Sequence, residues 1–276
     1  MKILVTGANG FLGTGIVKQL LDDGHDVIAT GRKLDRVDNR AEKIAADLFK
    51  IEDPFEFFGK PDVLLHLAWR NGFVHNSPSH MDDLPLHCRF LNEMVSGGIK
   101  KVAVMGSMHE VGFWEGAIDE KTPCFPQSLY GISKNSLRLY SELICKNAGV
   151  PLQWLRGYYI VSPLEYGCSI FSKIAVAAAE GKTEFPFTSG TNRYDFLDYE
   201  DFCRYAALAV SQDEITGIIN ICSGDPVSLG ERVERFIKDN HFKIQLKYGA
   251  FPDRPYDSKA VWGDSHKIRK IIENGK

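Results

Sequence analysis

A tyrosine and a lysine four positions apart are the residues whose types and spacing first suggest chemistry. Tyr130 and Lys134 open a long helical pattern over residues 128–147, and this separation places both side chains on one helix face. A free phenol has a pKa of about 10, too high to ionise usefully near neutral pH. A nearby ammonium lowers that pKa, so Tyr130 could exchange a proton with a substrate hydroxyl or carbonyl group.

A glycine-rich turn is the second candidate for chemistry. The stretch T-G-A-N-G-F-L-G follows the first apolar run and contains Gly7, Gly10 and Gly13. The first glycine permits a tight turn, the second lets the backbone approach a pyrophosphate, and the third allows close packing of helix on strand. The N-terminus of the following helix adds N–H donors and a positive dipole end. This arrangement predicts a dinucleotide site.

The end of the second expected strand bears on which dinucleotide is bound. NAD sites place an acidic residue there, about 20 residues after the glycines, to bind the ribose 2′-hydroxyl. This sequence reads T-G-R-K at that place, with Arg32 nineteen residues after Gly13 and no carboxylate. A guanidinium suits a 2′-phosphate. We therefore expect NADP(H) ahead of NAD(H); a solvated surface arginine is the alternative interpretation.

Short apolar runs alternate with helical patterns over the first part of the chain. Strands are expected at 3–6, 27–30, 63–67, 101–105 and 152–155, and helices at 11–23, 82–97 and 128–147. Such alternation indicates βαβ units and a parallel sheet. Later in the chain, helices are expected at 170–180, 199–211 and 230–239, and a strand at 217–222. The sequence predicts an α/β fold: a Rossmann-type doubly wound parallel sheet over residues 1–163 and a smaller mixed α/β substrate lobe over 164–276, with some segments returning to the sheet.

Composition limits the partners that we expect. The chain has 276 residues and a net charge of −3, without the basic stripe that nucleic acid or anionic lipid would require. No stretch approaches the ~20 apolar residues of a membrane span. The six cysteines are widely spaced, which is typical of reduced thiols. We expect a cytoplasmic protein that binds neither nucleic acid nor membrane.

The spacing G-x-x-G-x-x-G, together with Y-x-x-x-K, resembles the extended short-chain dehydrogenase/reductase superfamily, whose members are NAD(P)-dependent epimerases, dehydratases and reductases of nucleotide sugars. D-L at 47–48 resembles the family's adenine-contacting pair, and H-L-A at 66–68 resembles the strand end beneath the cofactor. Trp69 stands where a second alanine is usual, and Asp83 is the nearest match to an asparagine that relatives carry in the following helix. Further similarity continues to D-x-x-K at 264–267, so the resemblance covers essentially the whole chain.

The resemblance implies a role for each matching residue. Ser107, five residues before Gly112, takes the place of a catalytic hydroxyl that binds the substrate oxygen beside Tyr130. Lys134 would also hold the nicotinamide ribose. The implied cofactor site comprises Gly7, Asn9, Gly10, Phe11, Leu12, Gly13, Arg32, Asp47, Leu48, Leu67, Ala68, Tyr130 and Lys134. The implied substrate site comprises Ser107, Met108, His109, Arg193 and Arg254, the arginines binding a nucleotide-sugar diphosphate. A homodimer through helices 82–97 and 128–147 is implied as well.

The residues after Ser107 narrow the reaction. Family dehydratases carry an acidic pair there, and elimination of water requires such titratable groups. This sequence has Met108 and His109, while Glu110 is one place late and should face the other way. Dehydration is therefore not expected.

Among the reactions of the resembling family, we therefore expect oxidation or reduction at a single carbon. The function that we expect is NADPH-dependent reduction of a 4-keto or 4-keto-6-deoxy nucleotide sugar, because Arg32 favours an exchangeable NADPH. A nucleotide-sugar 4-epimerase is the alternative within the family. An alternative of another class is a non-catalytic NADP(H)-sensing regulator, although such proteins typically lose the catalytic tyrosine and Tyr130 is present.

A metal site has one set of candidate ligands, His75, His80, His87 and Cys88. Their spacings fit no closed zinc pattern, so exposed histidines flanking a helix are expected and no metal is.

Overall fold

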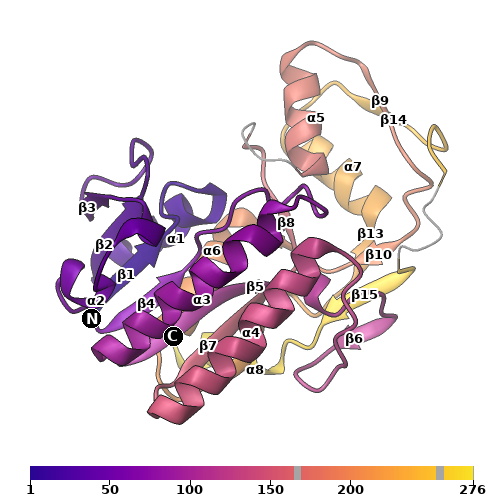
Figure 1. The fold of residues 1–276 in the computed structure, drawn as a ribbon. Helices are drawn as coiled ribbons and strands as arrows, with labels where there is room; N and C mark the ends of the chain where they lie inside the picture. The colour runs from indigo at the N-terminus through magenta and orange to yellow at the C-terminus, as the bar shows by residue number, and fades with distance from the viewer. Residues whose placement is uncertain (165–168, 253–257, 276) are drawn as a thin grey trace.

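A seven-stranded parallel sheet forms the centre of this computed structural model, which describes residues 1–164, 169–252 and 258–275 (Figure 1). The strand order is β12-β7-β5-β4-β1-β2-β3. The strands are β1 (Lys2–Thr6), β2 (Asp26–Gly31), β3 (Glu42–Ala45), β4 (Val63–His66), β5 (Lys101–Ser107), β7 (Leu152–Gly157) and β12 (Gly217–Ile221). Every residue of β4 and β5 is buried, because the crossovers of a parallel sheet place helices on both of its faces.

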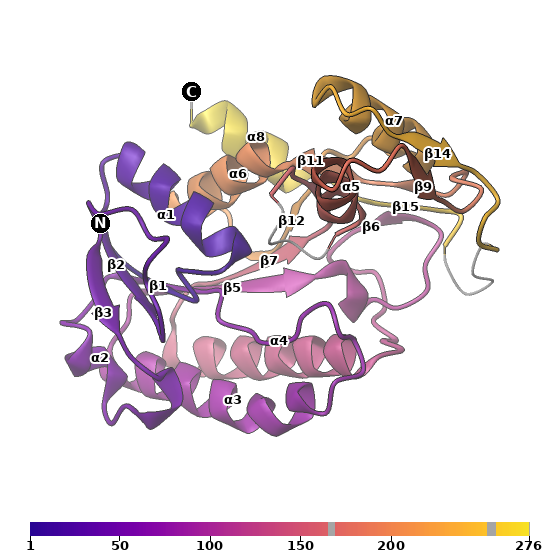
Figure 2. The same ribbon diagram turned by 90° about the horizontal axis from the view of Figure 1, so that it is seen from above.

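Helices cover both faces of this sheet (Figure 2). One face carries α3 (Ser79–Gly97) and α4 (Leu129–Ala148), with the short α2 (Pro54–Phe57) beside them; the other carries α1 (Phe11–Asp22), α6 (Tyr199–Ser211) and α8 (His266–Asn274). Side chains alternate along β1, so Ile3 and Val5 join the core beneath α1 and α6, while Leu4 joins the core beneath α3 and α4. Within the described ranges, no helix is long and apolar enough to cross a membrane.

A smaller mixed region lies beyond the carboxyl end of the sheet. Its strands are β6 (Gly116–Ile118), β8 (Tyr159–Val161), β9 (Glu184–Pro186), β10 (Arg193–Tyr194), β11 (Phe196–Asp198), β13 (Val227–Ser228), β14 (Gln245–Lys247) and β15 (Ala260–Gly263). They form a four-stranded sheet, β13-β10-β15-β6, and two pairs, β11-β8 and β14-β9. Helices α5 (Ile170–Ala179) and α7 (Leu229–Asp239) lie with β9 and β14 at the far end from β1 (Figure 1).

The predicted Rossmann-type fold class is confirmed, and each expected strand and helix is present. Helix α3 begins at Ser79, before the predicted residue 82, and runs on through Pro85. The elements that were not predicted are mostly strands of two to four residues, too short for an apolar pattern to repeat. Edge strand β3 is also largely exposed, with the polar sequence E-K-I-A.

Pairing crosses the predicted division near residue 163 in both directions. Strand β12, from the C-terminal part, pairs with β7 in the large sheet, so part of this sequence returns to it as expected. Strand β6, from the N-terminal part, pairs with β15 in the small sheet. The division at residue 163 stays a prediction.

The buried carboxylate of Asp195 joins the two regions. One oxygen accepts hydrogen bonds from the backbone N–H and the hydroxyl of Ser223, each at 2.7 Å. The other accepts from the N–H groups of Gly224 at 2.9 Å and Gly263 at 3.1 Å. Asp195 therefore links the loop after β12 to the end of β15, and it is fully buried.

Replacing Asp195 by asparagine should destabilise the fold, because an amide cannot accept all four of these bonds. Hydrogen bonds to a charged group contribute more than neutral ones, and we expect the free energy of unfolding to fall by roughly 3 kcal/mol. Urea unfolding measures this loss. The control is Asp201→Asn, which disrupts an exposed ion pair with Arg204 and should cost less than about 1 kcal/mol. Equal losses for the two variants would contradict this account of Asp195.

Candidate active site

A cavity of about 1770 Å³ opens at the carboxyl ends of β1, β2, β4 and β5. The strand order reverses between β1 and β4, and open α/β sheets bind ligands in the crevice at such a switch point. The cavity continues toward β8, β10 and β15 of the smaller region. Its walls include all of the predicted cofactor residues except Lys134, which is buried beneath the wall.

The glycine turn forms one end of this cavity and has the shape that a dinucleotide requires. Gly7 has a φ of +67°, and a Cβ on it would lie 2.7 Å from the Ala68 nitrogen. A Cβ on Gly13 would lie 2.3 Å from the Gly7 carbonyl oxygen, so α1 packs directly on the turn. Gly10 precedes α1 without a side-chain cap, and the first turn of that helix carries no acidic residue. The exposed N–H groups at this helix end fit a pyrophosphate.

The loop after β2 closes over the same end of the cavity. Asn9 accepts a hydrogen bond from the Arg36 backbone N–H at 2.8 Å and donates one to Asp35 at 3.1 Å. Arg32 lines the cavity with an exposed side chain. Asp47 lines it as well, and its carboxylate accepts from the Phe49 N–H at 3.3 Å. A guanidinium thus lines the cavity at the end of β2, and its predicted contact with the dinucleotide ribose stays a prediction.

Ser107, Tyr130 and Lys134 come together where β5 ends and α4 begins. Ser107 is the last residue of β5, and its hydroxyl acts on Tyr130 in the sense of a hydrogen-bond donor, since it lowers the pKa of the phenol. Lys134, one turn further along α4, donates to the Met105 carbonyl of β5 at 2.8 Å. Its ammonium lies 3.9 Å from the centre of the Trp69 ring, a cation–π contact.

Burial shifts the pKa values of both titratable groups. It lowers the pKa of Lys134 to about 7, because the charged ammonium loses its water. It raises the pKa of Tyr130 to about 12, and the hydrogen bond from Ser107 opposes this rise in part. The sequence-based expectation of a lowered tyrosine pKa is therefore wrong for the protein without cofactor: desolvation of the phenolate dominates. Tyr130 is a neutral phenol at pH 7.

Aromatic rings pack around Tyr130 at the cavity wall. The His75 ring stacks on it, with ring centres 5.5 Å apart and an interplanar angle of 11°. His109 lies 4.4 Å from His75, ring centre to ring centre. His75, His109 and Trp69 all line the cavity.

Two of the four residues weighed as metal ligands are placed differently from the prediction. His80 and His87 are buried rather than exposed. His80 accepts a hydrogen bond from the Trp69 indole at 3.1 Å, and His87 lies 2.8 Å from the ring nitrogen of His66. Both rings are buried against other rings: His80 stacks on Trp69, and His87 contacts Trp69 and His66. Among the described residues, no group of three or more His, Cys, Asp or Glu side chains could hold a metal ion.

Asp83, the nearest match to the family's usual asparagine, is paired with Arg70. Its carboxylate accepts two hydrogen bonds from the Arg70 guanidinium, one of them at 2.7 Å. Both residues line the cavity.

Of the two predicted substrate arginines, Arg193 alone lies within the described residues, and it is not brought to the cavity. Arg193 is exposed, donates to the Pro226 carbonyl at 2.8 Å and does not line the cavity. Arg254 lies outside the described residues. Their predicted role stays a prediction.

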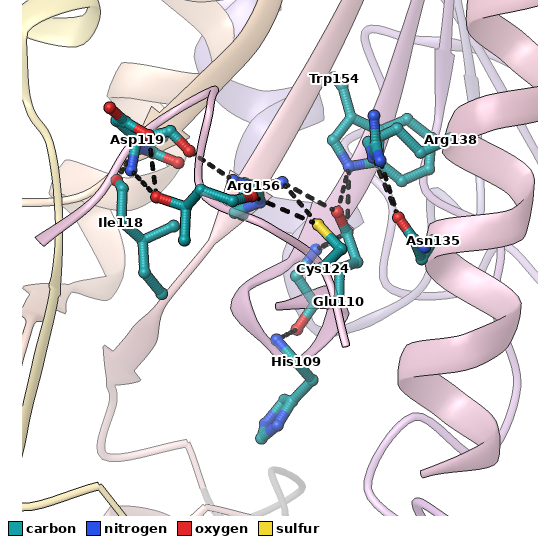
Figure 3. A network of polar contacts seen from close by, with 12 residues as sticks. His109, Glu110, Ile118, Asp119, Cys124, Asn135, Arg138, Trp154 and Arg156 are labelled. Atoms are coloured by element: carbon teal, nitrogen blue, oxygen red, sulfur yellow. Dashed lines mark hydrogen bonds and ion pairs between the residues drawn. The ribbon is translucent and has the colours of Figure 1, made fainter. Parts of the chain in front are cut away.

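A buried polar network behind Ser107 is the main feature that sequence reasoning missed (Figure 3). Glu110 is fully buried and does not line the cavity, which agrees with the expectation that it faces away from the substrate. Its carboxylate accepts hydrogen bonds from the Trp154 indole at 2.9 and 3.0 Å and lies 3.5 Å from the Arg156 guanidinium. The S-x-x-E spacing of residues 107–110, a capping-box pattern, could have indicated it.

The lowered pKa of Lys134 has a consequence for stability. The unfolded chain holds the lysine proton up to its usual pKa, whereas the folded chain loses it near pH 7. Burial of the Lys134 ammonium therefore lowers the free energy of unfolding by its full amount below pH 7. This cost declines as the pH rises toward 10.5.

Lys134→Met should consequently raise the free energy of unfolding by on the order of a few kcal/mol at pH 6 and by less at pH 9. Urea unfolding at the two pH values measures the difference. The control is Lys18→Met, at an exposed lysine paired with Asp22, which should show no such pH-dependent gain. If Lys134→Met raised the free energy of unfolding equally at pH 6 and at pH 9, burial would not lower the pKa of Lys134 in the folded protein.

Comparison with known proteins agrees with this fold. Residues 3–222 match the model of the NAD dependent epimerase/dehydratase family. The dTDP-6-deoxy-L-talose 4-dehydrogenase (NAD(+)) of Aggregatibacter actinomycetemcomitans is 42% identical over 269 residues, which cover 95% of this chain and 99% of that protein.

Solved structures of lower sequence identity share the fold. The UDP-N-acetylglucosamine 4-epimerase of Methanobrevibacter ruminantium superposes with a TM-score of 0.85 at 22% identity, over 98% of this chain and 91% of that one. The UDP-glucuronic acid 4-epimerase of Bacillus cereus, solved with UDP-glucuronic acid and NAD, gives 0.82 at 21% identity, over 99% and 93%. The family match and the 42% identical relative show that this chain belongs to the NAD dependent epimerase/dehydratase family.

Proposed function

We propose that this protein is a nicotinamide-dinucleotide-dependent oxidoreductase that interconverts a hydroxyl and a keto group at C4 of a nucleotide-linked 6-deoxyhexose. The observation that carries the proposal is that Ser107 and Tyr130 lie together on the wall of the cavity that begins at the glycine turn, with the Lys134 ammonium one turn along the helix of Tyr130. The choice of C4 and of a 6-deoxy sugar is supported by the name of the 42% identical relative.

The chain's own residues supply the proton chemistry. Ser107 would donate to the C4 oxygen and hold it beside Tyr130, where charge develops during the reaction. Tyr130 would exchange its proton with that oxygen. Lys134, in its charged form beneath the cavity wall, would lower the free-energy cost of forming the Tyr130 phenolate. A bound nicotinamide would supply or accept the hydride.

The protonation state of Tyr130 supports reduction of a 4-keto group as the direction. A phenol with a pKa of about 12 is protonated at pH 7 and ready to donate to a carbonyl oxygen. The dehydrogenation named for the relative is the same chemistry in reverse. Dehydration remains disfavoured, since Met108 and His109 follow Ser107 and the Glu110 carboxylate does not reach the cavity.

Both dinucleotides have support. Arg32 lines the cavity without a neighbouring carboxylate at the end of β2, which favours NADP(H). The relative's name specifies NAD(+). We propose that NAD(H) is used and that Arg32 additionally admits the 2′-phosphate of NADP(H).

Tyr130→Phe should reduce turnover by at least roughly 10²-fold, because it removes the proton donor while the ring remains in place. The assay follows NAD(P)H absorbance with a dTDP-4-keto-6-deoxyhexose and, in reverse, with dTDP-6-deoxy-L-talose. Affinity for the dinucleotide should stay within about threefold, measured by calorimetry. The control is Tyr140→Phe, on the same helix. Near-normal turnover of Tyr130→Phe would refute the role of Tyr130, and formation of the 4-epimer without net change in NAD(P)H would identify an epimerase.

Arg32→Asp should weaken the binding of NADPH by at least roughly tenfold relative to the binding of NADH. A carboxylate repels the 2′-phosphate and can accept a hydrogen bond from a free 2′-hydroxyl. Binding titrations with each dinucleotide give the ratio. Arg235→Asp, an exposed arginine on α7 outside the cavity, is the matched control for the change in net charge. An unchanged ratio in Arg32→Asp would exclude contact between Arg32 and the 2′ position.

A further inference from the structure

Glu110 connects the reacting residues to the interior of the protein. Its side chain is fully buried, three residues after Ser107, and does not line the cavity. It lies beside Trp154 and Arg156 of β7 (Figure 3). One carboxylate oxygen accepts from the Ser107 backbone N–H at 2.5 Å and from the Trp154 indole at 3.0 Å. The other accepts from the same indole and faces Arg156.

These bonds fix the direction of the Ser107 hydroxyl. The Ser107 oxygen accepts from backbone N–H groups of the turn that follows, including that of His109 at 3.3 Å, and Glu110 closes this capping box from the other side. Because the Ser107 oxygen accepts from the turn, its O–H proton is directed away from the turn, toward the cavity wall that Ser107 shares with Tyr130. Without the Glu110 carboxylate, the first backbone N–H of the turn would be buried without an acceptor.

Glu110 also places a carboxylate close to the site. Burial raises the pKa of this carboxyl group, while the Arg156 charge and the hydrogen bonds from Ser107 and Trp154 oppose the rise and favour the ionised form. Arg156, 1% exposed, is its counter-ion on β7 and also donates to the Asp119 carbonyl at 3.2 Å. The negative charge of Glu110 acts on the Lys134 ammonium and raises its pKa, against the larger effect of burial.

We propose that Glu110 is a positioning residue for the reaction: its buried carboxylate aims the Ser107 hydroxyl at Tyr130 and keeps a negative charge near Lys134. This inference rests on the proposed function for its effect on turnover, but its structural part does not depend on which substrate is used. The stretch S-M-H-E thus contributes two residues: Ser107 lines the cavity, and Glu110 accepts a hydrogen bond from the Ser107 backbone N–H on the side away from the cavity.

The charge of Glu110 predicts a pH effect on Lys134. The titratable groups that interact with the charge of this lysine are Glu110, His66 and His87, and Tyr130 lies one turn before it on α4. Burial lowers the pKa of His66 to about 3 and that of His87 to about 2, so both are neutral at pH 7, as is Tyr130. Removing the Glu110 charge should therefore lower the pKa of Lys134, and with it the pH at which the ammonium is lost.

Two variants separate the geometric effect from the electrostatic one. Glu110→Gln keeps an oxygen for the Ser107 N–H but removes the charge. It should lower the Lys134 pKa by about one unit. The pH above which kcat/KM falls should therefore become lower as well. Glu110→Asp keeps the charge but is too short to reach the turn. It should reduce kcat by at least roughly tenfold, leaving the Lys134 pKa and the KM for dinucleotide nearly unchanged.

The Lys134 pKa is read by NMR of lysine-labelled protein, as the side-chain resonance that titrates near pH 7 and is absent from Lys134→Met. Glu115→Gln is the control: this exposed carboxylate also accepts from backbone N–H groups, at Lys259 and Ala260, and its loss should leave the Lys134 titration in place. An unshifted titration in Glu110→Gln would overturn the electrostatic role.

Loss of stability must be distinguished from loss of positioning, since Glu110→Gln leaves the Arg156 charge buried alone. The double variant Glu110→Gln/Arg156→Met removes both charges and should recover stability. If turnover recovers with it, Glu110 merely neutralises Arg156 and the proposal is wrong. If stability recovers while the Lys134 pKa stays low and turnover stays impaired, the proposal is supported. Should the wild-type protein turn over no nucleotide sugar, the proposed function fails, while the NMR titrations still decide the role of Glu110.

Discussion

Burial of charge beneath the cavity is the constraint on which the rest of this site depends. The Lys134 ammonium, the Glu110 carboxylate and the Arg156 guanidinium are each at most 3% exposed. Taking an ion out of water costs several kcal/mol unless other groups replace the lost hydration. Here the replacements are the Met105 carbonyl, the Ser107 N–H and the Trp154 indole, all from β5 and β7. The charges are therefore fixed to two neighbouring central strands.

Because those strands are parallel, everything fixed to their carboxyl ends faces one edge of the sheet. The glycine turn follows β1, Arg32 follows β2, and Ser107 ends β5, so three segments far apart in the sequence line one cavity. Helix α4 then adds Tyr130 from its first turn. The smaller region closes the other side of the cavity, and the buried Asp195 carboxylate joins it to the sheet.

Residues with a repeating pattern or a motif were predicted well. The strands of the large sheet, with the exception of polar β3, and the long helices follow from apolar periodicity, and the glycine turn lines the cavity as its spacing indicates. Contacts between segments were not predictable. Nothing in the spacing of His80 and His87 shows that α3 turns them into the core, and nothing in the separate positions of Glu110 and Arg156 shows that they meet.

The fold class, the glycine turn and the Tyr130–Lys134 pair could be predicted from the amino-acid sequence, because each depends on residues close together in the chain. The tertiary structure decided the electrostatics. A phenol and an ammonium four residues apart predict a lowered tyrosine pKa, yet in the folded protein burial raises the pKa of Tyr130 and lowers that of Lys134. The physical reason is that desolvation depends on how many other segments pack around a group, and local spacing carries no record of that packing.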